Sequence, residues 1–491
     1  MCVAENTLRE VSVEFSAVSG QQRRDTQRSF LEKVAWPLFR QSQHPLRVQR
    51  MFYVEVRAGM WYTLFHTMTS HFFRKRSDMK LNDVQLRQVD VQVKRILTSD
   101  SYYARIYRAA GITGVESQAD FERIPFSDKN DLRNAYPLGI QAVPDEEVVR
   151  IHSSSGTTGK PVVIPYTARD VDDWATMFAR CYEFAGVTAK DRVQIAVAYG
   201  LWTAGSGFQA GAEKLGAMAI PMGPGNTEKQ LQMMQDLGAT VLTATSSYAL
   251  LLAEEVRKRG LRDKLRLRKG IFGSERWSEK MRECIRRDLG IELYDIYGLT
   301  EIYGPGIGIN CQKEHGIHYW DDFIYIEIID PVTGLPVPDG ETGEIVITTL
   351  VKEGAPLLRF RTRDLSRIIP EKCSCGSCFP RLDTIQGRSD DMFKVRGVNM
   401  FPRQVEEVLQ SAGGLLSEYQ IVIMRDEQAN KDRMTVTVEG EGGTDFAAAE
   451  ERVRNLFKSR IGMTPDIRVV QEGTLARSEK KTKRVIDHRY D

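Results

Sequence analysis

The chain has 491 residues, of which 42% are hydrophobic and 27% are charged, as in ordinary globular proteins. A chain of this length exceeds what one hydrophobic core supports, so two or three domains are expected. The 68 basic and 66 acidic residues leave a net charge of +2, which argues against a protein that binds nucleic acid through bulk positive charge.

The first 80 residues differ from the rest in composition, and we expect them to form a largely helical N-terminal extension. Residues 1–19 carry charged side chains where a signal peptide needs an unbroken apolar core, so export is not expected. No apolar run is long enough to cross a bilayer, and the expected location is the cytoplasm. The aromatic segment 51–73, closed by basic residues 74–76, fits a helix packed on the main body or an amphipathic helix for a membrane or partner.

A run of small hydroxyl residues and glycines begins at Ser153. Its sequence is Ser153-Ser154-Ser155-Gly156-Thr157-Thr158-Gly159-Lys160, followed by Pro161. Glycines allow turns that direct backbone N–H groups inward, hydroxyls add small donors, and Lys160 adds a positive charge. Only two residues separate the glycines, so the run is not a Walker loop. It predicts a polyphosphate site, with a flexible Ser/Gly turn as the alternative.

Short β-rich runs alternate with helical patterns from about residue 190 to 300, which predicts a parallel or mixed sheet covered by helices. The expected strands are Val193–Val197, Val241–Thr245 and Gly270–Phe272, and the expected helices are Thr227–Leu237, Tyr248–Lys258 and Glu279–Asp288. Residues 324–370 favour a β-rich subdomain. The fold class is therefore α/β, with a first large domain expected at 81–387.

The pattern changes again after Arg388 and predicts a small α+β domain at 388–491. Its expected elements are a helix at Arg403–Ser411, strands at Gln420–Met424 and Met434–Val438, and a helix at Ala447–Ser459.

Seven cysteines in a chain expected in a reducing compartment do not predict disulfide bonds. Three lie within six residues and further cysteine and histidine residues lie upstream: Cys373, Cys375, Cys378, Cys311, His315 and His318. Zinc prefers four sulfur or nitrogen ligands in a closed tetrahedral structural site. These residues therefore predict such a site, with unliganded surface thiols as the alternative.

Four further segments carry side chains suited to nucleotide chemistry. They are Tyr294–Glu301, Arg359–Asp364, Gly387–Gly397 and Arg477–Arg484. The first ends an expected strand with a ring, a hydroxyl and a carboxylate, the groups required beside a nucleotide and a magnesium ion. The second offers a carboxylate for ribose hydroxyls. The last brings basic side chains near the carboxyl terminus, where a solvated charge run is the alternative.

With these segments in this order, the chain resembles the adenylate-forming enzymes from about residue 80 to the end. Asn226–Leu231, Ser246–Leu250 and Arg396–Pro402 are similar to the phenylacetate-CoA ligase branch of that superfamily. The resemblance implies a large N-terminal adenylation domain with a small mobile C-terminal domain. It also implies two steps, in which a carboxylate attacks the α-phosphorus of ATP to form acyl-AMP and coenzyme A then displaces AMP.

The resemblance further implies which residues bind the nucleotide. The phosphates would be held by Ser153, Ser154, Ser155, Gly156, Thr157, Thr158, Gly159 and Lys160, and the rest of ATP by Ser274, Glu275, Asp295, Tyr297, Asp364 and Arg388. Tyr297 would pack near adenine, and Asp364 with Arg388 would bind ribose. Thr300 and Glu301 would serve phosphate and Mg²⁺ in catalysis.

Two implied roles fall in the small domain. Lys481 is the candidate catalytic lysine, a mobile charge that bridges carboxylate and phosphate oxygens. The family usually has glycine before this lysine where the chain has Lys480, so Lys480 and Lys483 stay open as alternatives. Asp390 matches the hinge about which the small domain rotates to admit coenzyme A.

The segment Tyr199–Phe208 combines aromatic residues with glycines, which suits a flat ring. The family comparison implies an acid pocket lined by Tyr136, Gln141, Tyr199, Gly205, Gly207, Phe208 and Ala210. Core packing is the alternative, and it fits Leu201 better than the glycines. The family often has aromatic residues where Gln141 and Ala210 stand, so there is room for a ring substituent. We expect phenylacetate first, and an amino- or hydroxy-substituted benzoate or phenylacetate second.

By the same resemblance, the zinc ligands are Cys311, His318, Cys373 and Cys375, with Cys378 or His315 as substitutes. The implied cofactors are ATP, Mg²⁺ and coenzyme A, and a homodimer is expected.

Three other functions stay open at this point. One is loading of an acyl group onto the phosphopantetheine of a carrier protein, which the first 80 residues would dock. The second is adenylylation of a deazaflavin cofactor, and the third is a non-catalytic scaffold. The set Lys160, Glu301, Asp364 and Lys481 argues against the scaffold, which has no need of charges that converge on a phosphate.

Overall fold

The computed structural model describes residues 80–154, 160–201, 204–275, 277–313, 316–396, 398–426, 431–477 and 484–489. The chain divides into two compact units, Met1–Arg74 and Lys75–Asp491, and all described residues belong to the second. The expected N-terminal extension lies, except for Lys80, outside the described residues. Among those residues, no helix combines the length and the apolar character that a membrane crossing requires. The cytoplasmic location stays a prediction.

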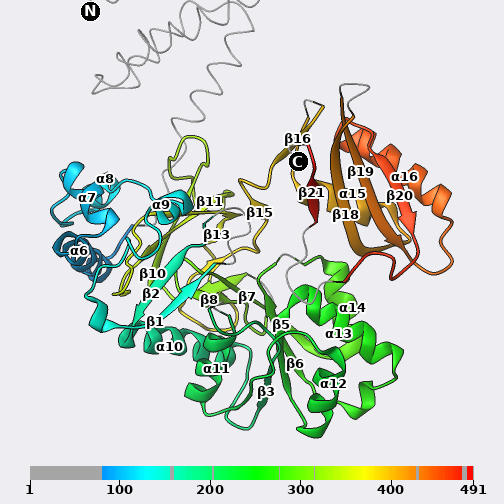
Figure 1. The fold of residues 1–491 in the computed structure, drawn as a ribbon, viewed down its shortest axis with the longest axis horizontal. Coiled ribbons are helices and arrows are strands. Elements are labelled where there is room, and N and C mark those ends of the chain that lie inside the picture. Colours follow the sequence, from blue (N-terminus) through cyan, green and yellow to red (C-terminus); the bar gives the residue numbers. More distant parts are fainter. Residues whose placement is uncertain are drawn as a thin grey trace, which may run out of the picture. The chain divides into compact units, whose positions relative to one another are not determined.

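The described part opens with helices that each begin at a capping side chain. They are α6 (Asp83–Thr98), α7 (Tyr102–Ala109), α8 (Gln118–Arg123) and α9 (Lys129–Asn134), followed by a 3-10 turn at Asp145–Glu147 (Figure 1). The caps are Asn82, Ser101, Ser117 and Asp128, whose side-chain oxygens accept backbone N–H groups of the first turn. Each helix start is thus encoded locally.

A two-stranded hairpin follows, formed by β1 (Val148–Ser153) and β2 (Val163–Thr167). The strands are antiparallel, with Ser153 opposite Val163. β2 leads directly into α10 (Ala168–Phe184), because the Thr167 hydroxyl accepts the backbone N–H of Asp170 and caps the helix. The run expected to bind polyphosphate therefore connects the two strands of a hairpin.

The central sheet has nine described strands in the order β13-β14-β9-β8-β7-β6-β5-β3-β4. They are β3 (Arg192–Ile195), β4 (Met218–Ile220), β5 (Val241–Thr245), β6 (Lys269–Gly273), β7 (Glu292–Leu299), β8 (Gly304–Ile309), β9 (Ile317–Tyr319), β13 (Ile368–Ile369) and β14 (Arg381–Leu382). β4, β3, β5, β6 and β7 are parallel, and the other pairs are antiparallel. The expected mixed sheet is confirmed.

Helices cover both faces of this sheet (Figure 1). Besides α10 they are α11 (Ala204–Leu215), α12 (Thr227–Asp236), α13 (Ser246–Lys258) and α14 (Glu279–Leu289), with a 3-10 turn at Arg262–Lys264. Successive strand residues point to opposite faces. Val241 and Ile271 therefore join the core with α10 and α11, whereas Leu242 and Phe272 join the core with α12, α13 and α14. The helices expected between residues 227 and 288 are confirmed to within two residues at each end.

A second, antiparallel sheet has the strand order β10-β11-β12-β15. Its strands are β10 (Ile324–Ile329), β11 (Gly343–Thr349), β12 (Phe360–Ser366) and β15 (Gly387–Arg388). The β-rich subdomain expected over 324–370 is confirmed. The register pairs Asp364 of β12 with Arg388 of β15. Two residues expected at the ribose are thus neighbours across one strand pair.

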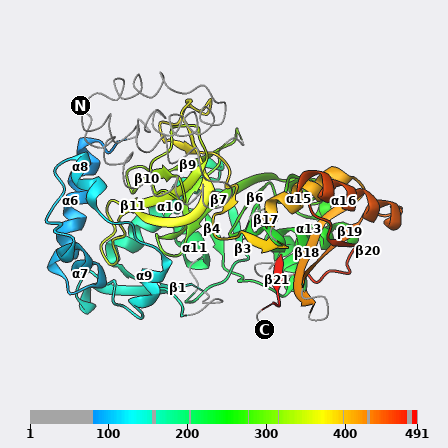
Figure 2. The same cartoon turned by 90° about the horizontal axis from the view of Figure 1, so that it is seen from above.

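The chain ends in a small α+β domain with its own core, as expected. Its elements are β16 (Phe393–Val395), β17 (Val398–Met400), α15 (Pro402–Ala412), β18 (Leu415–Asp426), β19 (Lys431–Gly440), α16 (Phe446–Arg460), β20 (Asp466–Val470) and β21 (Val485–Asp487). The larger sheet has the order β20-β19-β18-β21, and α15 and α16 pack against each other beside it (Figure 2). Val405, Ile421 and Val453 are fully buried in its core. The domain boundary at residue 388 stays a prediction.

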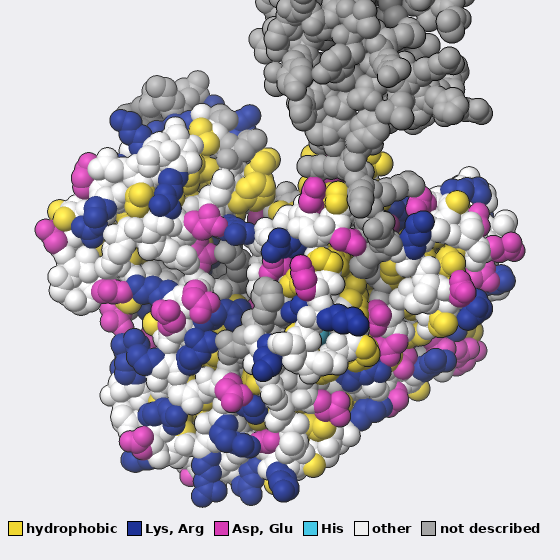
Figure 3. Space-filling view, turned by 180° about the vertical axis from the view of Figure 1, so that it is seen from behind, with side chains coloured by type: hydrophobic (Ala, Val, Ile, Leu, Met, Phe, Trp, Pro, Cys, Tyr) yellow, Lys and Arg dark blue, Asp and Glu magenta, His cyan; other side chains and the backbone are white. Residues whose placement is uncertain are grey.

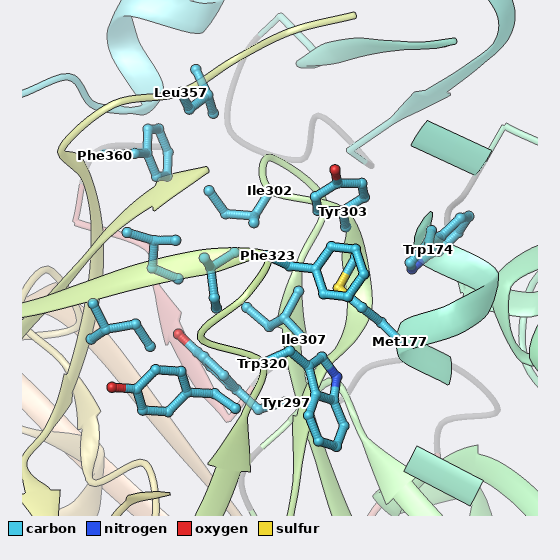
Figure 4. Packing of buried hydrophobic residues seen from close by; sticks show 14 of the residues in the cluster. Trp174, Met177, Tyr297, Ile302, Tyr303, Ile307, Trp320, Phe323, Leu357 and Phe360 are labelled. Carbon is cyan, nitrogen blue, oxygen red and sulfur yellow. The ribbon is translucent and has the colours of Figure 1, made fainter. Parts of the chain in front are cut away.

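Buried aromatic side chains lie behind the hairpin and the end of β7. The Tyr166 ring lies with its centroid 5.7 Å from that of Trp174 and 6.3 Å from that of Tyr303. Figure 4 shows Ile302 and Tyr303 within this cluster. Aromatic pairs at such separations stabilise a core beyond the area they bury. On the surface, by contrast, acidic and basic side chains alternate over the face seen in Figure 3, in keeping with the small net charge.

Candidate active site

The site forms where β7 ends and turns back into β8. Ligands of open α/β sheets bind beyond the carboxyl ends of parallel strands, and β7 is the last parallel strand before the antiparallel β8. The turn between them contains Thr300 and Glu301. It is tight because a Cβ atom on Gly298 would lie only 2.1 Å from the Gly304 carbonyl oxygen. Glycine at 298 therefore allows the sharp turn that holds both candidate catalytic residues.

Tyr297, Asp364 and Arg388 form one hydrogen-bonded cluster that joins the two sheets. The Tyr297 hydroxyl donates to one Asp364 oxygen at 2.8 Å, and an Arg388 Nη donates to the other at 3.1 Å. Tyr297 is 7% exposed, and burial raises its pKa, so its hydroxyl stays a neutral donor. The cluster fixes the orientation of the Asp364 carboxylate. Sequence reasoning expected these three residues in one nucleotide site, and they do lie together.

Arg388 also contacts the expected hinge. Its Nε and an Nη donate to the two Asp390 oxygens at 2.8 and 3.0 Å, a bidentate pair. Asp390 has half of its side-chain surface exposed. The hinge candidate is therefore linked through one arginine to the carboxylate expected at the ribose.

Glu301 is 5% exposed and has an unexpected partner. The ammonium of Lys129, at the first position of α9, lies 2.8 Å from Glu301 Oε1. Asp128, which caps α9, is in turn paired with Arg363 at 3.0 Å. These two ion pairs connect α9 to β12 and to the turn that contains the candidate catalytic residues.

Sequence reasoning missed Lys129, although a signal was present. Asp128 and Asp131 have the spacing of a capping box and mark a helix start. A lysine in the first turn opposes the helix dipole, which favours acidic side chains there. Such a misplaced charge indicates a partner elsewhere in the fold, and here that partner is Glu301.

The candidate phosphate run is described only at its two ends. Ser153 is buried, and its backbone N–H donates to the Leu201 carbonyl at 2.8 Å. Ser154 pairs with Val162 through its backbone N–H and its hydroxyl, at 2.9 and 3.0 Å. Ser155, Gly156, Thr157, Thr158 and Gly159 lie outside the described residues. Lys160 is exposed, and its ammonium lies 5.8 Å from the centroid of the Tyr136 ring.

Ser274, Glu275 and Asp295 have contacts within the large domain. Ser274 follows β6 with a left-handed φ of 71°. A Glu275 carboxylate oxygen accepts the backbone N–H of Ser247 at 2.9 Å, at the start of α13. Asp295 accepts from Arg282 of α14 at 2.7 Å, and its burial raises its pKa. The nucleotide roles of all three stay predictions.

Two of the expected pocket residues lie in the segment between α9 and β1. Tyr136 is 44% exposed beside Lys160. The side-chain amide of Gln141 donates to the Val143 carbonyl at 3.0 Å and to Asp145 at 2.7 Å. Its Oε1 has no partner within the described residues although it is buried. The pocket role of Gln141 stays a prediction.

The glycines of the expected pocket are explained largely by close packing. A Cβ on Gly205 would lie 2.7 Å from the Tyr199 ring, and one on Gly207 would lie 2.2 Å from the Phe178 ring. Phe208 is 2% exposed, and its ring centroid lies 4.7 Å from that of Phe178. Leu201, by contrast, is 45% exposed. The packing alternative was expected to fit Leu201 rather than the glycines, and that expectation was wrong on both counts.

The remaining pocket residues have looser surroundings. Ala210 of α11 is half-buried. Tyr199 is half-buried too, and its buried hydroxyl has no partner among the described residues. Burial raises the Tyr199 pKa, so this hydroxyl is neutral. Tyr199 and Ala210 therefore stay candidates for the acid pocket.

Four expected zinc ligands lie together at the other end of β8. The candidate ligand atoms of Cys311, His318, Cys373 and Cys375 all lie within 4.8 Å of one another. The Cys311 and Cys373 sulfurs are 3.6 Å apart, and the Cys375 sulfur is 3.5 Å from His318 Nε2. His318 Nδ1 lies 2.9 Å from the Phe379 carbonyl oxygen. Cys378 is exposed and not part of the group, and His315 lies outside the described residues.

Lys480, Lys481 and Lys483 also lie outside the described residues, but the residues on either side are firmly held. Arg477 pairs with Glu439 at 2.8 Å and with Glu254 at 3.1 Å. Arg484 pairs with Glu418 at 2.9 Å. Glu439 and Glu418 are buried, so these ion pairs anchor both ends of the lysine-bearing segment.

Comparison with protein families defines the class of the chain. The family of AMP-binding enzymes matches residues 88–350, more than half of the chain. The C-terminal domain of AMP-binding enzymes matches residues 397–489. The first match covers β3 to β9 of the central sheet, and the second covers the small α+β domain from β17 onward.

Individual relatives narrow this class. A phenylacetate-coenzyme A ligase of Escherichia coli is 41% identical over 421 residues, which cover 84% of this chain and 95% of that protein. A phenylacetate-coenzyme A ligase of Pseudomonas putida is 44% identical over 382 residues, which cover 75% and 85%. A crystal structure of 2-hydroxyisobutyryl-CoA ligase in the postadenylation state aligns with a TM-score of 0.74 at 28% identity, covering 82% of this chain and 89% of that one. The chain belongs to the phenylacetate-CoA ligase family of the adenylate-forming enzymes.

Proposed function

We propose that this protein is an AMP-forming ligase that activates an aromatic carboxylic acid with ATP and transfers the acyl group to coenzyme A. The observation that carries the proposal is the hydrogen-bonded cluster of Tyr297, Asp364 and Arg388 at the end of β7, with Glu301 buried in the turn that follows, in a member of this family. These groups supply a fixed carboxylate, a guanidinium and a second, buried carboxylate. Such a set can position a nucleotide and a metal ion, which is most of what acyl-adenylate formation needs.

Nucleotide binding is assigned within this proposal as follows. The 153–160 run would hold the β and γ phosphates, for which Lys160 and the glycine-rich backbone are suited. Asp364 would accept hydrogen bonds from the ribose hydroxyls, because its orientation is already fixed by Tyr297 and Arg388. Ser274, Glu275 and Asp295 would complete the adenosine site.

The donor set at the turn fits a magnesium ion. Mg²⁺ prefers carboxylate, phosphate and water oxygens, and Glu301 and Thr300 offer a carboxylate and a hydroxyl. The present partner of Glu301 is the Lys129 ammonium, a positive charge at 2.8 Å, which supports a cation at this carboxylate. When bound, the metal would neutralise charge that builds on the phosphate oxygens. Lys129 would then be released toward the phosphates, whose charge it also complements.

The small domain would contribute the catalytic lysine and the hinge. Lys481 is the preferred candidate, with Lys480 and Lys483 as alternatives. Arg477 and Arg484, on either side of these lysines, are held by ion pairs with Glu439 and Glu418. Asp390 would be the hinge: it lies between β15 and β16, and its half-exposed side chain pairs with Arg388.

The cysteine and histidine cluster fits zinc. Tetrahedral zinc with Zn–S bonds of about 2.3 Å and Zn–N bonds of about 2.0 Å places two sulfurs roughly 3.8 Å apart and a sulfur and a nitrogen roughly 3.5 Å apart. The observed separations of 3.6 and 3.5 Å are close to these values. Backbone N–H groups of Lys313, Cys375 and Ser377 donate to the ligand sulfurs, as in outer-shell support of metal sites. Four protein ligands leave no open position, so the role would be structural.

The resemblance to the same family also supports specific proposals for the acid substrate and for the acceptor of the acyl group. Phenylacetate comes first among acids, followed by amino- or hydroxy-substituted benzoates and phenylacetates, for which Gln141 Oε1 and the small Ala210 leave room. A homodimer and a possible carrier-protein acceptor are part of the proposal. Size-exclusion chromatography with light scattering tests the first. Acylation of a phosphopantetheine carrier in place of coenzyme A tests the second.

One assay decides the main proposal. Purified protein is incubated with Mg·ATP and a panel of aromatic acids, and pyrophosphate release is measured with and without coenzyme A. Release that depends on the acid, with formation of an acyl-CoA only when coenzyme A is present, is the expected result. Failure to exchange labelled pyrophosphate into ATP with every acid would refute it. Release without consumption of a thiol would indicate deazaflavin-type adenylylation instead.

A further inference from the structure

Lys352 is a fully buried lysine with an unusual set of partners. It follows β11 and has no exposed surface. Its ammonium donates a hydrogen bond to the backbone carbonyl of Ile302. It also lies 3.9 Å from the centroid of the Tyr166 ring and 4.2 Å from that of Tyr303, a geometry in which ring faces attract cations. Among the described residues, no carboxylate forms an ion pair with Lys352.

A buried ammonium without a carboxylate is costly, because it gives up its hydration. Burial lowers the pKa of Lys352 below its ordinary value, while the charge of Asp170 acts in the opposite direction. The Asp170 carboxylate itself is held by the backbone N–H groups of Thr167, Glu353 and Gly354, at 3.0, 2.7 and 2.8 Å. A methionine would fill the same space without the cost. Lys352, unlike a methionine, supplies a hydrogen-bond donor to the Ile302 carbonyl.

The partners of Lys352 lie in the turn that carries the candidate catalytic residues. Ile302 directly follows Thr300 and Glu301. The next carbonyl, that of Tyr303, accepts the Tyr166 hydroxyl at 3.0 Å. Two consecutive carbonyls of the turn are thus held from the protein interior, and Figure 4 shows Ile302 and Tyr303 among the buried side chains behind it. The turn cannot rotate without losing both hydrogen bonds.

We propose that Lys352 is a positioning residue for acyl-adenylate formation: by holding the Ile302 carbonyl, it keeps the turn in the geometry in which Thr300 and Glu301 bind Mg²⁺ and the triphosphate. The inference rests on the function proposed above. A displacement of about 1 Å in a catalytic group can lower a rate by about 100-fold, so a fixed turn matters for the reaction.

The test separates the two half-reactions in Lys352→Met. Pyrophosphate release with Mg·ATP and the best aromatic acid is expected to fall about 10- to 100-fold, with a higher Mg²⁺ concentration needed for half-maximal rate. Reaction of chemically prepared aryl-AMP with coenzyme A is expected to stay within about twofold of wild type, because this step uses neither triphosphate nor its metal. Thermal unfolding is measured on the same samples.

Lys269→Met is a matched control. Lys269 is 8% exposed, and its ammonium lies 5.4 Å from the Tyr294 ring centroid and 2.6 Å from Glu292 Oε2. It belongs to β6 of the central sheet, which also contains the two strands that flank the turn. It stands at the start of β6, at the opposite end of the strands from the turn. It should leave both half-reactions unchanged. Lys352→Arg, which keeps a cation, should recover part of the lost rate.

Tyr166→Phe supplies a milder variant in case Lys352→Met does not fold. It keeps the ring but removes the donor to the Tyr303 carbonyl, and pyrophosphate release should fall about 3- to 10-fold while the aryl-AMP reaction is retained. Equal losses in both half-reactions, in parallel with a loss of thermal stability, would overturn the inference and leave Lys352 a core residue. A wild-type rate in Lys352→Met would also overturn it. Wild-type protein that releases no pyrophosphate would refute the proposed function and the inference together.

Discussion

The two ends of strand β8 hold two different kinds of candidate cation site. Before Gly304 the chain carries Glu301, a hard oxygen donor whose present partner is a lysine ammonium. After Ile309 it carries Cys311, one of four soft or borderline ligands that face one another. Hard oxygen sites suit magnesium and exchange readily, whereas sulfur and nitrogen sites suit zinc held permanently. Strand β8 thus connects a candidate site suited to a metal ion that exchanges with a candidate site suited to one that stays bound.

The comparison shows that Glu301 and Cys311 differ in the groups they contact more than in their burial. Glu301 and Cys311 are 5% and 3% exposed, so burial does not distinguish them. Glu301, however, is paired with Lys129, whose side chain is 42% exposed and free to move toward solvent. Cys311 lies next to the other candidate ligands, and its sulfur accepts the backbone N–H of Lys313. A substitution of Glu301 should therefore lower activity more than stability, and a substitution in the cysteine cluster should lower stability more than activity.

The largest change in activity is expected from Glu301→Gln, at the end of β8 that begins with Gly304. The amide keeps the shape but removes the charge, so pyrophosphate release should fall by at least about 100-fold. Zinc content and the melting temperature should change little, because the other end of β8 is untouched. Steady-state pyrophosphate release and metal analysis of the same preparation measure both. If Glu301→Gln retained activity, the proposed catalytic role of Glu301 would be refuted.

Asp390→Pro should separate the two half-reactions in the opposite way from Lys352→Met. Proline restricts the backbone at the expected hinge, so domain rotation should be impaired while the first step persists. Acyl-CoA formation is expected to fall roughly 10- to 100-fold, with pyrophosphate release within a few-fold of wild type.

Asp390→Ala is the control for this variant, because it also removes the pair with Arg388 but leaves the backbone free. It should support both steps. Equal loss of both half-reactions in Asp390→Pro would argue against a hinge at this position.

Removal of a candidate zinc ligand should lower metal content and stability but leave most of the activity, the reverse of Glu301→Gln. Cys375→Ser is expected to lose bound zinc and to lower the melting temperature by several degrees, with kcat reduced by less than about threefold. Cys378→Ser is the control, because this exposed cysteine lies outside the ligand group. Metal analysis and thermal unfolding of freshly purified protein are the measurements. Absence of zinc from the wild type would refute the site.

The smallest effect concerns pH and the aromatic cluster behind the turn. Burial lowers the pKa of His152 to about 4, with the charges of Arg150 and Lys352 acting in the same direction. The unfolded chain protonates near pH 6.5 and the folded chain near 4, so stability is present above this window and is lost as pH falls through it. The unfolding free energy should fall by about 1 kcal/mol between pH 7.5 and 5.5.

His152→Phe should flatten this part of the pH dependence, because the ring is kept without a titrating group. Its neighbours Tyr166 and Trp174, with ring centroids at 5.3 Å, already form an aromatic surrounding. Chemical denaturation at a series of pH values measures the effect. An unchanged slope in the variant would assign the acid sensitivity to another group.

Local signals explain why much of the fold could be predicted. The helices at 227–236, 246–258 and 279–289 are amphipathic and begin at capping side chains. The strands between them are short and contain Val241, Thr243, Ile271 and Phe272, residue types common in strands. The four zinc candidates and the Tyr297, Asp364 and Arg388 set were also expected together, because family motifs in order carry long-range information that composition does not.

What sequence could not provide was contact between distant segments. Lys129 and Glu301 are separated by 172 positions, and Lys352 meets Ile302 across 50, so no local pattern links them. Gly205 and Gly207 were read as pocket residues because glycines beside aromatic residues are typical of both a ligand site and close helix packing. The distances to Tyr199 and Phe178 show close packing, and the pocket role of both glycines stays a prediction.

The ion pairs of Arg477 and Arg484 have a practical consequence for protein engineering. They hold the residues on either side of positions 478–483. Substitutions can therefore be confined to these six positions, and both ion pairs can be left unchanged. A library that moves a single lysine through these positions, in a background without Lys480, Lys481 and Lys483, would map where along them a positive charge supports turnover.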